Sequence, residues 1–275
     1  MTGFPFGPAL LFCPADRPDR YARAVSSADA VILDLEDAVD PARRVLAREA
    51  LVAADAEGRL DPERVIVRVN PAGTDDHGAD LAALAVTDLT TVMLPKAESV
   101  DDLRDLTGLD VIALCETARG VMGAPQLAGA AGVVALMWGA EDLVASMGGT
   151  SSRHDDGRYR DVAVHARSSV LLAASAAGIG AVDTVHLDIA DLAGLGAEAV
   201  DAAAVGFAAT ACIHPSQVET IRAAYRPSGD EIANARALLD AAAGAGGVFA
   251  FEGRMVDGPV LAHARIVLRR AGLDG

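Results

Sequence analysis

Two acids, Glu116 and Asp142, stand at the ends of apolar runs and have the residue type and spacing of a metal site. They lie 26 residues apart, about the length of one strand–helix unit, so we expect them on neighbouring strands. Adjacent carboxylates repel each other unless a cation lies between them. Oxygen ligands without a His or Cys cluster favour Mg²⁺, which keeps positions open for water and substrate. The pair therefore predicts a magnesium site.

The charged residues near this pair also fit structural roles. Asp142 in "GAEDL" is suited to cap a helix, and Lys96 in "LPKAES" to a solvated loop. Arg68 in "VIVRVN" is harder to explain in this way, because a charge in a buried strand needs a partner. The prediction of a site therefore rests on the joint pattern. Charged or polar residues follow the strand-like runs at Asp34, Glu36, Asp37, Arg68, Asn70, Lys96, Glu116, Glu141, Asp142, Asp188 and His214.

Short apolar runs rich in Val, Ile and Leu alternate with longer Ala-rich segments of helical character. Such runs are typical of parallel strands that are buried on both faces. We expect eight strands, over residues 9–15, 30–37, 64–70, 91–98, 110–117, 133–142, 181–189 and 209–217. Eight strands with helices between them predict an α/β fold, the (β/α)8 TIM barrel. The carboxyl ends of its strands meet at one mouth, where active sites lie.

An open doubly wound sheet is the competing fold. Such a sheet usually binds ligands through a glycine-rich first turn, and the first turn here, "CPADRPDR", has no glycine. In the barrel, period-two alternation places Leu114 and Glu116 on one face of the fifth strand. The same rule places Trp138 and Asp142 on one face of the sixth strand.

The segments between the strands are long enough for crossover helices. Residues 40–57 open on Asp-Pro, a favourable helix start, and residues 160–177 form a second clear example. We expect residues 1–228 to form the barrel and residues 229–275 to form a C-terminal helical lid or oligomerisation segment.

The composition excludes some classes of partner. The chain has 275 residues, with 23 Lys and Arg against 39 Asp and Glu, a net charge of −16. Nucleic acids and anionic membranes need basic faces, so neither is expected as a partner. Cys13, Cys115 and Cys212 lie in apolar runs, which suits reduced thiols in a cytosolic protein. No stretch has the ~20 apolar residues of a membrane span and no signal peptide is evident, so a cytoplasmic protein is expected.

Several stretches together resemble the citrate lyase β-subunit-like proteins of the HpcH/HpaI aldolase superfamily. The matching motifs are "LFCPADRPDR", "VILDLEDAV", "VIVRVNPAGT", "VMLPKAES", "ALCETARGV", "MWGAEDL", "CIHPSQV" and "FEGRMVDGPVLAHAR". They span almost the whole chain in family order, and they are most similar to the stand-alone mycobacterial and actinobacterial members, often called CitE-like. The resemblance implies a (β/α)8 barrel, a homotrimer and a Mg²⁺-dependent acyl-CoA lyase.

The resemblance also implies roles for the residues at the strand ends. Glu116 and Asp142 match the two magnesium ligands of the family. Arg68 matches the arginine that contacts the bound keto acid and the developing oxyanion. Glu36 and Asp37 match acids beneath the metal site that order its waters and Arg68.

Three further roles come from the resemblance alone. Asp257 matches the catalytic acid/base, which the C-terminal segment of a neighbouring subunit delivers. Arg20 and Lys96 match contacts for the coenzyme A portion of the substrate.

The expected reaction is cleavage of a citramalyl-CoA or malyl-CoA type substrate into acetyl-CoA and a short 2-keto acid, such as pyruvate or glyoxylate. Two alternatives stay open within the enzyme class. The chain would otherwise be a citrate lyase β-subunit acting on citryl-acyl carrier protein, or a CoA-independent 4-hydroxy-2-oxo-acid aldolase. A non-enzymatic binding protein is a further alternative, against which Glu116, Asp142, Arg68 and Asp257 all argue.

Overall fold

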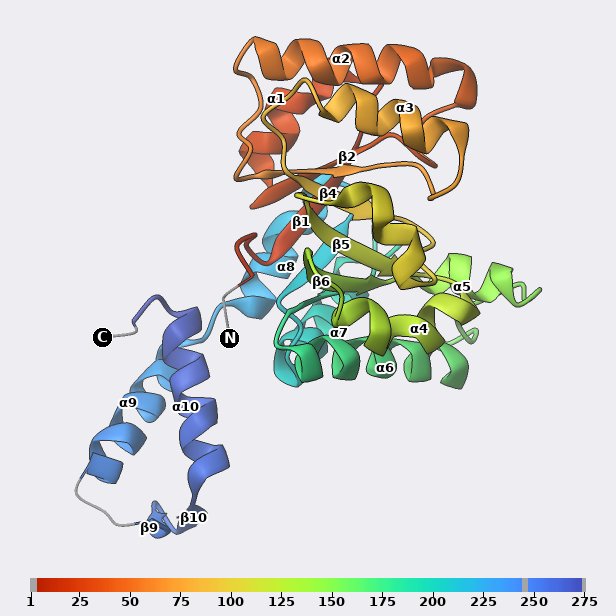
Figure 1. Ribbon diagram of the computed structural model, residues 1–275. Coiled ribbons are helices and arrows are strands. Elements are labelled where there is room, and N and C mark those ends of the chain that lie inside the picture. The colour runs from red at the N-terminus through yellow and green to blue at the C-terminus, as the bar shows by residue number, and fades with distance from the viewer. Residues whose placement is uncertain (1–3, 244–246, 274–275) are drawn as a thin grey trace. The chain divides into compact units, whose positions relative to one another are not determined.

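Eight parallel strands close into one barrel in sequence order (Figure 1), which confirms the predicted TIM-barrel fold. The structure is a computed structural model that describes residues 4–243 and 247–273. The strands are β1 (Ala9–Pro14), β2 (Ala30–Asp34), β3 (Val65–Arg68), β4 (Thr91–Leu94), β5 (Asp110–Cys115), β6 (Val133–Trp138), β7 (Gly180–Asp183) and β8 (Ala209–Cys212). Each begins within one residue of its expected start and ends earlier than expected.

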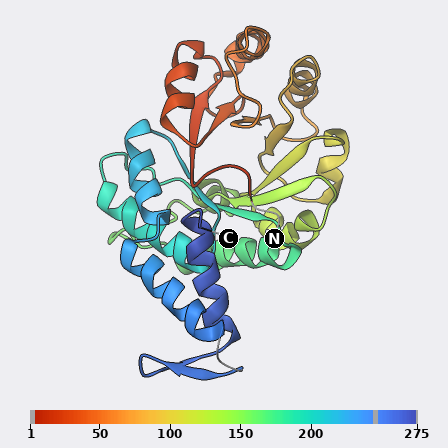
Figure 2. The same ribbon diagram turned by 90° about the vertical axis from the view of Figure 1, so that its left-hand side faces the viewer.

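Helices connect the strands and lie around the outside of the barrel (Figure 2). The α-helices of this part are α1 (Pro18–Ser27), α2 (Arg44–Ala56), α3 (Asp75–Leu84), α4 (Ala118–Ala128), α5 (Ala140–Ser146), α6 (Asp161–Ala177), α7 (Leu192–Val205) and α8 (Val218–Tyr225). Short 3₁₀ helices occur at η1 (Pro41–Arg43), η2 (Val100–Leu106) and η3 (Pro215–Gln217). Asp40 caps η1 and accepts a hydrogen bond from the Ala42 N–H, as the Asp-Pro start predicts.

The barrel interior is filled by apolar side chains that alternate with outward-facing ones. Ile112 and Leu114 of β5 belong to this interior cluster, as do Ala135 and Met137 of β6. Trp138 is therefore on the outer face of β6, where its indole N–H donates to Asp183. The predicted strand face that joins Trp138 to Asp142 is wrong, because β6 ends at Trp138 and the chain turns into α5.

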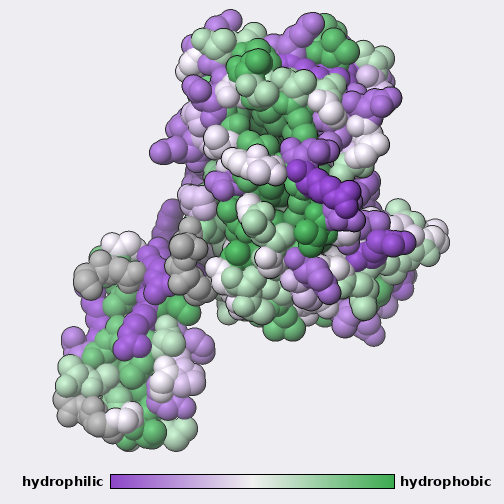
Figure 3. Space-filling view, viewed as in Figure 1, coloured by the Kyte–Doolittle hydropathy of each residue, from purple (hydrophilic) through white to green (hydrophobic). Residues whose placement is uncertain are grey.

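The chain divides into two compact units, Met1–Ile221 and Arg222–Gly275, and the second is the C-terminal part. Its elements are α9 (Gly229–Ala243), the antiparallel hairpin of β9 (Phe249–Phe251) and β10 (Arg254–Val256), and α10 (Gly258–Arg270). Ala235, Leu238, Val256 and Ala264 form its small core. Hydrophobic residues also reach the surface of this unit (Figure 3), among them Met255, which is 68% exposed. The prediction of a helical C-terminal extension is confirmed.

Among the residues that the structure describes, no helix is both long and apolar enough to cross a membrane.

Candidate active site

Arg68 is the most firmly held charged residue at the carboxyl ends of the strands. It ends β3 and pairs in register with Asp34, which ends β2. Its Nε and Nη2 atoms donate to the two Asp34 carboxylate oxygens at 2.7 and 2.5 Å, and its guanidinium lies over the Phe12 ring, 5.0 Å from the centroid. Burial favours a neutral group, but the Asp34 hydrogen bonds and nearby carboxylates outweigh it and raise the pKa of Arg68. The side chain is thus a fixed positive charge.

Glu36 lies behind Arg68 and connects it to Lys96. Its Oε2 atom is 3.0 Å from Arg68 Nη1, and its Oε1 atom accepts from the Lys96 ammonium. Only 2% of the Glu36 side chain is exposed, and this burial raises the pKa of its carboxyl above the usual value despite the two cations. Asp37 is exposed and lies 3.4 Å from the same ammonium. The two acids expected beneath the metal site therefore form ion pairs with the side chains of Arg68 and Lys96.

Glu116 directly follows β5 and is buried at the mouth of the barrel. Its Oε1 atom accepts a hydrogen bond from the backbone N–H of Lys96 at 3.1 Å. Burial, and then the charge of Asp142, raise the pKa of Glu116 to about 8, although Lys96 and Arg68 act in the opposite direction. An acid held in this way needs a proton or a cation at neutral pH.

The second oxygen of Glu116 is directed toward the end of β6. Cys115 of β5 pairs with Trp138 of β6, so the next residues, Glu116 and Gly139, lie side by side. A Cβ atom built on Gly139 would be only 2.8 Å from Glu116 Oε2. Glycine is therefore required at this position for the carboxylate to keep its place.

Asp142 lies in the first turn of α5, and its charge acts on Glu116. It is partly buried, and within the described part of the chain neither it nor Glu116 Oε2 has a hydrogen-bond or ion-pair partner. No group of three or more His, Cys, Asp or Glu able to hold a metal occurs in residues 4–243 and 247–273. A cation at this pair would therefore need further oxygens from substrate or water, as Mg²⁺ commonly does.

The remaining predicted site residues make contacts other than the predicted ones. Lys96, predicted to contact coenzyme A, directs its ammonium at Glu36 and Asp37. Arg20 is exposed on α1, and its guanidinium forms no hydrogen bond or ion pair with the described residues. Asp257 belongs to the C-terminal unit, where it caps α10 and accepts from the Val260 N–H.

Three other strand-end residues have structural contacts. His214 is the N-cap of η3. The Asp188 carboxylate accepts the backbone N–H groups of Ala190 and Asp191 in an exposed turn. Glu141 accepts a hydrogen bond from the buried Ser152 hydroxyl at 2.5 Å, which ties the 148–159 loop to the helix that carries Asp142.

Two known protein families match this chain. A profile of the HpcH/HpaI aldolase/citrate lyase family matches residues 9–215, and one of C–C bond lyases of the TIM-barrel fold matches residues 158–275. The chain belongs to the HpcH/HpaI aldolase/citrate lyase family. As a member of this family it is a carbon–carbon lyase, and the family resemblance inferred from the motifs is confirmed.

Similar proteins within the family include a citrate lyase subunit beta-like protein of Mycobacterium tuberculosis, 59% identical over 97% of this chain and 96% of that protein. Human mitochondrial citramalyl-CoA lyase is 29% identical over 94% of this chain and 83% of its own length. The crystal structure of CitE from M. tuberculosis with magnesium, acetoacetate and coenzyme A has a TM-score of 0.92 and 58% identity, covering 97% of this chain and 98% of CitE. CitE with magnesium and pyruvate has a TM-score of 0.84 and 54% identity over 96% and 98% of the chains.

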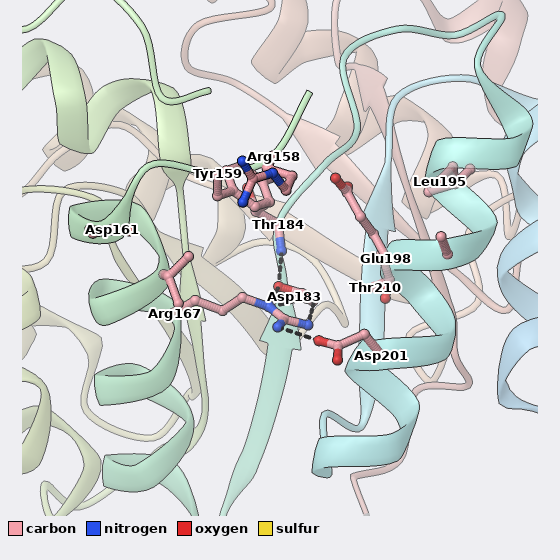
Figure 4. A pocket seen from close by; sticks show the side chains of 12 residues that line it. Arg158, Tyr159, Asp161, Arg167, Asp183, Thr184, Leu195, Glu198, Asp201 and Thr210 are labelled. Carbon is pink, nitrogen blue, oxygen red and sulfur yellow. Dashed lines mark hydrogen bonds and ion pairs between the residues drawn. The ribbon is translucent and has the colours of Figure 1, made fainter. Parts of the chain in front are cut away.

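A cavity of about 420 Å³ in this family member contains none of the predicted site residues. It lies between α6 and α7 beside the end of β7 (Figure 4). Arg167 from α6 reaches across it and binds Asp183 at 2.9 Å and Asp201 of α7 at 2.6 Å. The sequence did not predict Asp183 as a strand-end residue, because the expected seventh strand runs to residue 189 and β7 ends at Asp183. The short apolar run that ends at Asp183 is the sequence signal for this earlier strand end.

Proposed function

We propose that the protein is a Mg²⁺-dependent acyl-CoA lyase that cleaves a 3-hydroxyacyl-CoA of the citramalyl-CoA or malyl-CoA type. The observation that carries this proposal is the pair of carboxylates at the mouth, Glu116 and Asp142, beside the fixed charge of Arg68. Their unpaired oxygens and the raised pKa of Glu116 suit a cation shared with a substrate.

Glu116 and Asp142 would hold the metal. When bound, Mg²⁺ supplies a Lewis acid that lowers the pKa of the substrate hydroxyl and stabilises the keto acid. Glu116 Oε2 is the oxygen that would bind it, since Oε1 already accepts from the Lys96 N–H. Magnesium in the CitE structures supports this assignment, because the chains are 54–58% identical.

Arg68 would stabilise the negative charge that develops on the keto acid. A guanidinium has five N–H donors; Asp34 accepts from two of the Arg68 nitrogens, and Glu36 Oε2 lies 3.0 Å from the third. Donors therefore remain for a substrate oxygen. Because Asp34 and Phe12 fix the guanidinium before substrate arrives, the charge needs no reorganisation during the reaction.

The cleavage breaks the carbon–carbon bond between the hydroxyl-bearing carbon and the carbon next to the thioester. The hydroxyl proton would pass to water in the site, the hydroxyl-bearing carbon becomes the carbonyl of the 2-keto acid, and the electron pair of the broken bond forms the thioester enolate. Asp257 would then donate a proton to the enolate carbon to give acetyl-CoA. Asp257 would regain its proton through the same water, so the substrate yields the two products with no further reactant.

The coenzyme would be held at the same mouth. Arg20 is exposed on α1 and its guanidinium has no partner among the described residues, which suits contact with a phosphate. Coenzyme A and pyruvate in CitE, and the citramalyl-CoA lyase activity named for the human relative, support a citramalyl-CoA type substrate.

The test is Mg²⁺-dependent release of acetyl-CoA and keto acid from the stereoisomers of citramalyl-CoA and malyl-CoA. We expect release that EDTA abolishes and that Glu116→Gln lowers by about 10²-fold or more. Glu57→Gln, at the exposed acid that follows α2 as its C-cap, is the matched control and should leave the rate unchanged. No release from any CoA ester by folded, metal-bound protein would refute the proposal. Citryl-acyl carrier protein and 4-hydroxy-2-oxo acids would then be assayed as substrates.

We also propose that Asp257 acts on the site of a neighbouring subunit in a homotrimer, with residues 229–275 as the lid. Glu116→Gln and Asp257→Asn subunits would each be inactive alone. If they are unfolded and reassembled together at 1:1, about a quarter of the sites would be intact, because each site draws its two residues from two subunits. Activity near zero in mixtures that form trimers would contradict a shared site.

A further inference from the structure

Lys96 has an unusual backbone conformation at the barrel mouth. Its φ is +51°, in the left-handed region that lysine seldom adopts, and Glu252 is the other non-glycine residue with positive φ in the described chain. Lys96 lies two residues beyond the end of β4, next to the sites of Glu36 and Glu116. Strained backbone of this kind persists only where the surroundings maintain it.

Two groups of Lys96 contact two different parts of the candidate site. The backbone N–H donates to Glu116 Oε1 at 3.1 Å. The side-chain ammonium binds Glu36, the acid that also contacts Arg68, and lies 3.4 Å from Asp37. One residue therefore connects the proposed metal ligand to the acids around Arg68.

The chain just after Lys96 is fixed by close backbone packing. The Ala97 N–H donates to the Leu114 carbonyl of β5 at 3.1 Å. A Cβ on Gly120 of α4 would lie 2.4 Å from the Ala97 carbonyl oxygen, and one on Gly123 would lie 2.6 Å from that of Glu98. The two glycines thus let α4 lie directly against residues 97 and 98. With the chain after Lys96 held in this way, the φ of Lys96 helps to set the direction of its N–H.

We infer that Lys96 is a positioning residue for the metal ligand, and that its ammonium maintains the left-handed backbone that directs its N–H at Glu116. The contact keeps Glu116 Oε1 occupied and Oε2 available beside Gly139. This inference rests on the proposed role of Glu116 as a magnesium ligand. It assigns Lys96 a role other than contact with coenzyme A.

Replacement of Lys96 by alanine and by glycine separates the effect of its ammonium from the effect of its backbone conformation. Both variants lack the ammonium and keep the backbone N–H. Only glycine adopts a φ near +51° without a penalty, so Lys96→Gly should retain the hydrogen bond to Glu116. Without its ion pairs, Lys96→Ala should relax to negative φ and lose that bond. Lys96→Arg restores a cation and should recover the contact with Glu36.

The experiment measures two dissociation constants by calorimetry on the full chain, one for Mg²⁺ and one for free coenzyme A. Loss of a hydrogen bond to a metal ligand typically costs 10–100-fold in metal affinity, so the Mg²⁺ constant of Lys96→Ala should rise by about tenfold or more. Those of Lys96→Gly and Lys96→Arg should stay within about threefold of the wild type. The coenzyme constant should not change in any variant.

Two results would overturn the inference. One is equal Mg²⁺ affinity of the alanine and glycine variants, which would show that the backbone conformation does not position Glu116. The other is weakened coenzyme binding with unchanged Mg²⁺ affinity, which would make Lys96 a coenzyme contact. Neither constant depends on turnover. A wild-type protein that binds Mg²⁺ but cleaves no acyl-CoA would therefore refute the proposed reaction and leave this test intact.

Discussion

Magnesium binding should depend steeply on pH, because Glu116 must lose its proton to bind the metal. The pKa of Glu116 is raised to about 8 by burial and by the neighbouring charge of Asp142. Metal affinity follows the ionised fraction of the ligand. With this pKa the fraction is about one hundredth at pH 6 and about one tenth at pH 7.

The expected result is a Mg²⁺ association constant that rises about tenfold from pH 6 to 7, or ~1.4 kcal/mol, and about fivefold from pH 7 to 8, and then levels off. Titration calorimetry in buffers of different ionisation enthalpy would also count the protons released. About one proton should leave per Mg²⁺ at pH 7, and almost none above pH 9.

A variant of Asp142 checks the cause of the shift. Asp142→Asn removes the repelling charge and should lower the pH at which proton release is half complete, whereas burial of Glu116 is unchanged. Affinity that is constant between pH 6 and 8, with no proton release, would refute the reasoning, since Glu116 would then be ionised before the metal arrives.

The same shift determines how stability depends on pH in the metal-free protein. The folded-state pKa of Glu116 lies above the value of 4.5 for an unperturbed Glu, so between these two values the folded state holds a proton that the unfolded chain has lost. This contribution is fully present below about pH 4.5 and is lost as pH rises through 8, at up to ~1.4 kcal/mol per unit. Denaturation in EDTA should show this trend, and Glu116→Gln should remove its share.

Three further predictions concern single substitutions. Gly139→Ala should weaken Mg²⁺ binding by about tenfold or more, because its Cβ would displace Glu116. Gly129→Ala has ordinary contacts at 3.7 Å and should not change the affinity. Arg68→Lys should lower kcat by about 10²-fold, because lysine cannot bind both Asp34 oxygens, and an unchanged kcat in a steady-state assay would contradict this role. Asp257→Asn keeps a capping side chain and should retain the melting temperature while losing at least about 10²-fold in kcat. A parallel loss of thermal stability would instead indicate a structural role.

Much of the site could be located from the sequence because a parallel barrel converts order along the chain into position in space. Once the apolar runs predict eight strands, their carboxyl ends meet at one mouth. Arg68 and Glu116 are therefore expected near each other, although 48 residues separate them. A charge in a buried strand also requires a partner, and Asp34 on the neighbouring strand provides it.

The sequence could not give the boundaries at which strands become helices. Trp138 and Asp142 share the alternation of a strand, but the chain turns at Gly139 into α5. At this turn a Cβ on Gly139 would lie too close to the Glu116 side chain, and that approach is a contact between residues that follow two different strands. A local pattern does not contain such a contact.

The sequence by itself determined the barrel, the family and the acids at the mouth, since these follow from hydrophobic periodicity and from motifs of adjacent residues. Only the tertiary structure decided how those acids are paired. The ammonium of Lys96 binds Glu36, its backbone N–H binds Glu116, and one oxygen of Glu116 has no partner among the described residues. The physical reason is that burial and ionic contacts depend on distances between strands that are far apart in the chain, and these distances fix both the pKa of Glu116 and the position of each oxygen.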